Sequence, residues 1–167
     1  MIVGMFSSVL LVLVCILVHY EALRIVSSQL PGPSWIGLRG RMLAVVAACF
    51  LAHTIEVWIF AVAYYFLSDH FSLGAIAGER QIDFPDLVYF SAVTYSTIGF
   101  GDLYPIGGAR LLAGVEAVIG LLLIGWSASF TYLVMERFWP LHAIRKKRPA
   151  ADGKEPVPPR LWHRLPD

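Results

Sequence analysis

The sequence predicts an all-α membrane protein with three transmembrane helices and a re-entrant segment between the second and the third. Of the 167 residues, 57% are hydrophobic and only 15% are charged, and the mean hydropathy is +0.67. Soluble domains carry about 25% charged residues, so this composition excludes that class. Three apolar runs, residues 2–20, 42–67 and 109–135, each reach the roughly 20 residues that a membrane-spanning helix needs.

Residues 1–30 are predicted to form the first transmembrane helix. The apolar run 2–18 could also be a cleaved signal peptide, but no basic residues precede it and no small-residue cleavage pattern follows it. We therefore favour a retained helix, which is expected to leave the membrane at its inner surface near His19 and Glu21.

A cytoplasmic linker is predicted over residues 31–41, where Pro31 and Pro33 cannot continue a helix. Basic residues flank this linker and follow the third span, whereas the loop 68–108 is mainly acidic. Because basic residues concentrate on the cytoplasmic side, we expect the amino terminus outside and the carboxyl terminus in the cytoplasm. The basic residues that set this orientation are Arg24, Arg39, Arg41, Arg137, Arg145, Lys146, Lys147 and Arg148.

The second span, residues 42–67, is followed by an exposed loop over residues 68–84. A short helix is predicted next, over residues 85–95. Proline is tolerated in the first turn of a helix, and an acidic side chain complements the positive helix end, so Pro85 and Asp86 mark its start.

Residues 97–102 read Thr-Ile-Gly-Phe-Gly-Asp and follow this short helix directly. Gly99 and Gly101 can adopt the positive φ that lets successive carbonyls face the same side of an extended chain. Ile98 and Phe100 are then expected to point back into the protein. Such a chain presents stacked backbone oxygens, which are the ligands that a dehydrated cation requires.

This stretch and its flanking segments resemble the pore of potassium channels of the prokaryotic type, over about residues 42–135. The resemblance implies a pore domain at residues 42–136, preceded by one additional helix at 1–30. Its parts would be an outer helix (42–67), a turret (68–84), a pore helix (85–95), a filter (97–101) and an inner helix (109–136).

The same resemblance implies a homotetramer in the plasma (inner) membrane, because each chain supplies one strand of a fourfold filter. Potassium ions in the filter are the ligands it implies, with no other cofactor or metal. The K⁺-coordinating carbonyls would be those of Thr97, Ile98, Gly99 and Phe100. The Thr97 hydroxyl would join them, Gly101 would cap the filter, and Asp102 would form an acidic ring at the outer mouth.

Two positions depart from the family pattern. Phe100 stands where tyrosine is commonest, and Val93 stands where some members have a glutamate that holds the aspartate after the filter. We therefore expect a weaker restraint on Asp102.

The inner helix contains Gly120 and Gly125, which by position are candidates for a gating hinge. Glycines also let helices approach closely, so a packing role is an equally good interpretation.

The tail, residues 137–167, is basic and then rich in proline, which predicts disorder. A basic cluster beside a spanning helix favours contact with anionic lipid over nucleic-acid binding. This cluster consists of Arg145, Lys146, Lys147 and Arg148.

Three ionisable residues lie within the predicted spans: His53, Glu56 and Glu116. At a rise of about 1.5 Å per residue they reach a similar depth in a ~30 Å hydrocarbon core, so they could meet. Intramembrane ionisable groups are functional candidates by default. They could form a network that senses pH through His53, or a structural hydrogen-bonded set with neutral carboxyls.

The sequence thus indicates a passive potassium-selective channel. The alternatives are a less selective cation channel and a non-conducting pore-like membrane subunit. An enzyme is not expected, because no nucleophile and base pair stands out. His53 and Glu56 also lack the second histidine of a zinc-binding helix.

Overall fold

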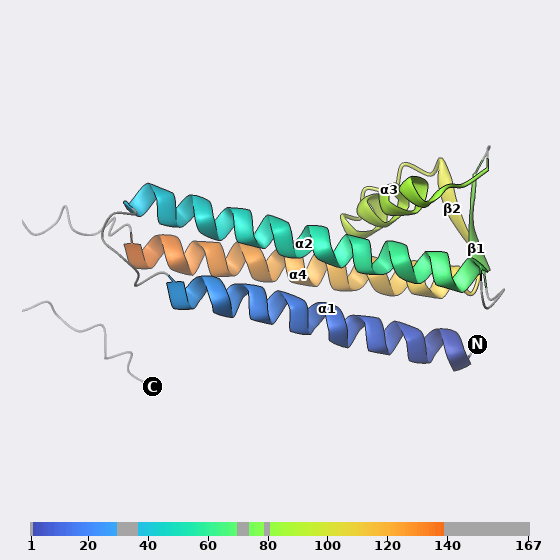
Figure 1. Ribbon diagram of the computed structural model, residues 1–167, viewed down its shortest axis with the longest axis horizontal. Helices are drawn as coiled ribbons and strands as arrows, with labels where there is room; N and C mark the ends of the chain where they lie inside the picture. Colours follow the sequence, from blue (N-terminus) through green and yellow to red (C-terminus); the bar gives the residue numbers. More distant parts are fainter. Residues whose placement is uncertain (1, 30–36, 70–73, 79–80, 139–167) are drawn as a thin grey trace, which may run out of the picture.

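The computed structural model describes residues 2–29, 37–69, 74–78 and 81–138. Three long helices lie side by side, and a short helix and a two-stranded sheet cover one end of this bundle (Figure 1). The elements in chain order are α1 (Ile2–Gln29), α2 (Leu38–Asp69), β1 (Gly74–Gly78), α3 (Phe84–Tyr95), β2 (Leu103–Gly107) and α4 (Ala109–Phe138).

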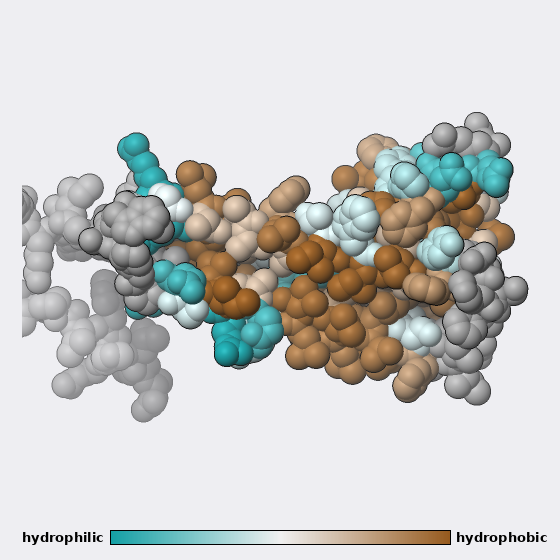
Figure 2. Space-filling view, in the orientation of Figure 1, coloured by the Kyte–Doolittle hydropathy of each residue, from teal (hydrophilic) through white to brown (hydrophobic). Residues whose placement is uncertain are grey.

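All three long helices are long and apolar enough to cross a membrane, which confirms the prediction of three spans. The candidate spans are Phe6–Gln29, Arg39–Leu67 and Ala109–Arg137. Hydrophobic side chains cover much of the visible face of the bundle (Figure 2). Lipid leaves no need for a polar outer face, so these helices show no strong amphipathic pattern.

The sequence predicts that the first helix leaves the membrane near His19, but its candidate span continues to Gln29 and the His19 side chain is 0% exposed. The reason is that Leu23 is buried in a second apolar cluster together with Val45 of α2 and Val134 of α4.

The second helix begins at Leu38, so the last residues of the predicted linker 31–41 are helical. Arg39 and Arg41 lie in its first turns, where a helix end can extend beyond the hydrocarbon core. The other predicted linker residues, 31–36, lie outside the described residues, as do the tail from residue 139 and its basic cluster.

An antiparallel sheet joins the segment before α3 to the segment after it, and the sequence analysis did not predict this sheet. Strand β1 pairs with β2 from Gly74 opposite Gly107 to Gly78 opposite Leu103. Pro105 is tolerated in β2 because a two-stranded sheet consists only of edge strands. The sheet closes the polypeptide around α3 and so holds the far end of the loop that follows α3.

The main apolar cluster lies among α1, α2, α3 and α4. Phe60 and Tyr64 of α2 pack against Phe90 of α3, and the Tyr64 and Phe90 rings meet edge to face with centroids 5.2 Å apart. This packing holds the short helix against the bundle.

Candidate functional site

Helix α3 positions the candidate site. At its start, the Asp86 carboxylate accepts a hydrogen bond from the Asp83 amide at 3.0 Å, so an acidic side chain compensates the positive helix end. At its end, the loop folds back on the last turn. The amides of Ile98 and Gly99 both donate to the Val93 carbonyl, at 2.9 and 3.1 Å. The loop therefore begins at a fixed position relative to α3.

The loop backbone alternates in handedness. The φ angle is 59° at Thr97, 53° at Gly99 and 84° at Gly101, and the intervening Ile98 and Phe100 do not have positive φ. The two glycine conformations are those that the sequence predicted, whereas the positive φ of Thr97 was not anticipated. Alternation of this kind turns successive carbonyls toward one side of the chain.

The side chains of Ile98 and Phe100, which are expected to point back into the protein, lie at the surface of the single chain. They are 59% and 69% exposed. The described part of the chain leaves both side chains largely uncovered.

Asp102 has a partner that the sequence analysis overlooked. The Tyr89 hydroxyl of α3 donates to Asp102 Oδ1 at 3.2 Å, so the absence of a glutamate at Val93 does not leave Asp102 unrestrained. Tyr89 lies four residues before Val93, one helical turn earlier on α3. Desolvation and the Asp102 carboxylate raise the pKa of Tyr89 above its ordinary value. Both residues line a groove of about 920 Å³ on the sheet side of the loop, with Asp86 and Tyr104.

Gly120 and Gly125 differ sharply in their surroundings, although both lie in the continuous helix α4. A Cβ atom on Gly120 would lie 2.2 Å from the Tyr95 carbonyl oxygen, whereas one on Gly125 would meet nothing within 4 Å. The packing interpretation therefore fits Gly120, and Gly125 keeps its role as a predicted hinge.

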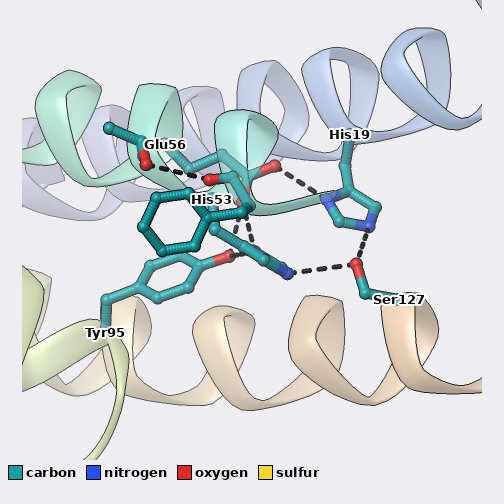
Figure 3. Close-up of polar contacts among 7 residues, drawn as sticks. His19, His53, Glu56, Tyr95 and Ser127 are labelled. Atoms are coloured by element: carbon teal, nitrogen blue, oxygen red, sulfur yellow. Dashed lines mark hydrogen bonds and ion pairs between the residues drawn. The ribbon is translucent and has the colours of Figure 1, made fainter. Parts of the chain in front are cut away.

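His53 and Glu56 belong to a buried polar cluster at the centre of the bundle (Figure 3). His19 Nδ1 lies 3.0 Å from Glu56 Oε1, and His53 Nδ1 lies 3.2 Å from Glu56 Oε2. The Tyr95 hydroxyl also donates to Glu56 Oε2. Ser127 Oγ lies 3.2 Å from His19 Nε2 and 3.0 Å from His53 Nε2. All four helices contribute to this cluster.

Glu116 lies in a second polar group, so the single network proposed from sequence divides into two. Tyr64 donates to Glu116 Oε2 at 2.5 Å, and Ser91 Oγ lies 2.5 Å from Glu116 Oε1 and 2.8 Å from the Val57 carbonyl. Ser91 has one hydroxyl hydrogen for these two acceptors. A protonated Glu116 that donates to Ser91 satisfies the whole group, which fits the structural interpretation with a neutral carboxyl.

We therefore expect Glu116→Gln to leave stability almost unchanged, because the amide can donate to Ser91 and accept from Tyr64. Glu116→Leu should lower the free energy of unfolding by about 1–3 kcal/mol, because the buried Tyr64 hydroxyl loses its acceptor. Unfolding of the purified protein in detergent measures both, and Glu136→Gln, at an exposed position of α4, is the control. A loss as large with glutamine as with leucine would mean that Glu116 is ionised.

The sequence analysis missed His19, Tyr95 and Ser127 as members of the central cluster. His19 was interpreted as a boundary residue because it stands near the end of the most apolar run. The charged residues Glu21 and Arg24 that follow His19 favour the interpretation as a membrane boundary, so the sequence carries little sign of a buried His19.

Comparison with known proteins gives a family match. The sequence model of a family described as "Ion channel" matches residues 52–137, which contain most of α2, all of α3 and the loop, and nearly all of α4. No solved structure matches the chain.

Three relatives are similar over part of the chain. The uncharacterized membrane protein YdjJ of Bacillus subtilis is 31% identical over 122 residues, which are 70% of this chain and 34% of that protein. The inward rectifier potassium channel Kirbac3.1 of Paramagnetospirillum magnetotacticum is 39% identical over 75 residues, 44% of this chain and 24% of that protein. The two pore potassium channel b of Oryza sativa subsp. japonica is 37% identical over 76 residues, 44% of this chain and 20% of that protein.

The chain thus spans about a third of the length of the first of these relatives and less of the other two. The family match, in contrast, covers half of the chain and contains every element that positions the loop. The protein is an integral membrane protein of the ion channel family and not an enzyme.

Proposed function

We propose that the protein is a passive potassium-selective channel whose filter is the loop 97–101. The observation that carries the proposal is the alternating backbone of this loop, with positive φ at Thr97, Gly99 and Gly101. A K⁺ ion that enters must exchange its water ligands for oxygens at similar distances, and rings of backbone carbonyls supply them. Two relatives that match part of the chain are named as potassium channels, which supports the same ion.

In this proposal the coordinating carbonyls belong to Thr97, Ile98, Gly99 and Phe100, and the Thr97 hydroxyl adds a ligand at the inner end. Gly101 caps the filter. Asp102 lies beyond Gly101 on an exposed loop, where a ring of carboxylates would raise the local cation concentration.

A homotetramer follows, because one loop offers oxygens on only one side of an ion. The exposed Ile98 and Phe100 side chains favour this assembly. They are large and apolar, and neighbouring subunits would bury them when four copies assemble around the pore axis. The mass of the detergent-solubilised complex, corrected for bound detergent, tests the assembly. A monomeric mass would contradict it.

We propose the orientation with the sheet outside the cell, in the plasma (inner) membrane. The start of α1 lies at the sheet end of the bundle, and the start of α2 and the end of α4 lie at the opposite end (Figure 1). That opposite end carries Arg39, Arg41 and Arg137. The contact of the basic cluster at residues 145–148 with anionic lipid is part of the same proposal.

Reversal potentials of the purified protein in planar bilayers, with K⁺ on one side and Na⁺ on the other, test the function. A reversal potential far from zero, negative on the K⁺ side, is the expected result, because it reports a high permeability ratio of K⁺ to Na⁺. A value near zero would favour the less selective cation channel. Absence of current from correctly assembled protein would favour the non-conducting subunit.

The bond from Tyr89 to Asp102 gives a further prediction. We expect Tyr89→Phe channels to lose current faster during sustained opening than the parent, because Asp102 loses its partner on α3. Tyr104→Phe, in the same groove, is the matched control. Single-channel recordings with equal decay for all three proteins would contradict the role of Tyr89.

The raised pKa of Tyr89 fixes the pH dependence of this effect. The bond needs the protonated hydroxyl, which is fully present below the ordinary tyrosine pKa of about 10 and is lost only as the pH rises through the higher folded value. The difference between Tyr89→Phe and the parent should therefore be constant from neutral pH to about pH 9 and should shrink only in stronger alkali.

A further inference from the structure

The central cluster brings two histidines and a carboxylate from two different helices to one point. One ligand atom from each of His19, His53 and Glu56 lies within 4.8 Å of the other two. His19 and Glu56 are 0% exposed, and the His53 side chain is 19% exposed. The second histidine that the sequence of α2 lacks is thus supplied by α1.

The spacing of the donor atoms fits a tetrahedral metal site. With metal–ligand bonds of about 2.0–2.1 Å, neighbouring ligand atoms of a tetrahedron lie roughly 3.3 Å apart. The two Nδ1 atoms lie 3.0 and 3.2 Å from the Glu56 oxygens, and the Tyr95 hydroxyl lies 2.8 Å from His53 Nδ1. Each histidine nitrogen therefore already lies close to the required separation from one Glu56 oxygen, and the Tyr95 oxygen lies beside them (Figure 3).

The number of hydrogen atoms available for bonds between Ser127 and the two histidines also favours a metal site. If both neutral imidazoles carry hydrogen on Nδ1, toward Glu56 and Tyr95, both Nε2 atoms are acceptors. Ser127 has a single hydroxyl hydrogen and can donate to only one of them, although both lie within 3.2 Å. With a metal on the Nδ1 atoms, each imidazole keeps its one hydrogen on Nε2. Both Nε2–H groups then donate to the two lone pairs of Ser127 Oγ, as ligand histidines usually do toward a second polar group.

We propose that His19, His53 and Glu56 bind a divalent transition-metal ion of the zinc class, with the Tyr95 oxygen as fourth ligand. Imidazole and carboxylate donors in a tetrahedral arrangement suit Zn²⁺, and Co²⁺ as its spectroscopic substitute. The ion carries two positive charges, and the Glu56 carboxylate compensates one of them. His53, as the partly exposed ligand, gives the ion access.

A metal here links the additional helix α1 to α2 and to the last residue of α3. Tyr95 lies two residues before Thr97, so a bound ion would fix the position at which the loop begins. The inference does not depend on which ion the loop conducts, because metal binding is measured without any flux.

The experiment uses the full-length protein in detergent, with the other histidines, His70, His142 and His163, replaced by glutamine and without a polyhistidine tag. Co²⁺ is titrated and its visible absorption is recorded, and Zn²⁺ is then added in competition. We expect one Co²⁺ per chain with the intense bands of tetrahedral coordination, displaced by Zn²⁺. Zn²⁺ should also raise the unfolding temperature of this protein, whereas Mg²⁺ should not.

His19→Gln and Glu56→Gln should abolish the cobalt spectrum. Ser127→Ala should weaken Co²⁺ binding about 10–100-fold, because the histidines lose the group that orients them. The matched control is Glu21→Gln, an exposed carboxylate two residues from His19 on α1.

A spectrum that survives in His19→Gln would overturn the proposal. So would the absence of both tetrahedral cobalt bands and zinc stabilisation in the folded parent, in which case a shared proton would account for the hydrogen count. Because the zinc shift is measured in a protein with all three ligands intact, a variant that fails to fold does not decide the test.

Discussion

Replacing Gly101 by alanine should abolish potassium-selective conduction. The Gly101 φ is +84°, in the left-handed region, where an L-residue with a Cβ costs roughly 1–2 kcal/mol. Nothing lies within 4 Å of the position that a Cβ would occupy, so the cost is conformational and not steric. If the alanine relaxes to negative φ, the neighbouring carbonyl turns away from the ion path. In a tetramer the change occurs in every copy at the same level of the filter.

The measurement is K⁺ flux into proteoliposomes, followed by the reversal potential where current remains. Gly37→Ala is the matched control, because Gly37 also has open space around it but lies outside the loop and has no positive φ. We expect the control to conduct as the parent does. Unchanged K⁺ over Na⁺ selectivity in a correctly assembled Gly101→Ala channel would show that ions do not pass along this loop.

The parts of the structure that the sequence predicted are those that depend on local chemistry. The three spans follow from apolar length, and the start of α3 follows from Pro85 and Asp86, whose effects act within one helical turn. The positive φ of Gly99 and Gly101 follows from the residue type, since glycine alone adopts it without strain.

The features that the sequence did not predict depend on contacts between distant segments. Strands β1 and β2 are too short to show a period of two, and they exist because they pair with each other. Two partners of Glu56 come from other helices, α1 and α3, and the placement of His19 beside Glu56 requires the register between two helices. That register is set by packing, which a single sequence does not display.

Of the glycine-to-alanine substitutions in the inner helix α4, Gly120→Ala should lower stability the most. Its Cβ would lie 2.2 Å from the Tyr95 carbonyl oxygen and 2.9 Å from the Tyr95 carbonyl carbon, both of them backbone atoms that cannot rotate away. Either α4 or the end of α3 must move. Overpacking of this kind costs about 1–3 kcal/mol. The displacement also reaches the loop, because Tyr95 is the last residue of α3 and the loop amides are bonded to Val93.

Gly125→Ala on the same helix separates packing from hinge function. The added Cβ atom meets no atom within 4 Å, and alanine is favoured over glycine in a helix interior by about 1 kcal/mol. The unfolding temperature of Gly125→Ala should therefore equal or exceed that of the parent. Gly120→Ala should unfold at a lower temperature and lose K⁺ flux. If Gly125 is the hinge, Gly125→Ala should keep its stability and its selectivity but change the open probability in single-channel recordings. Equal stability of the two variants would contradict the close approach of α4 to Tyr95, since only one of the two methyl groups meets the backbone of α3.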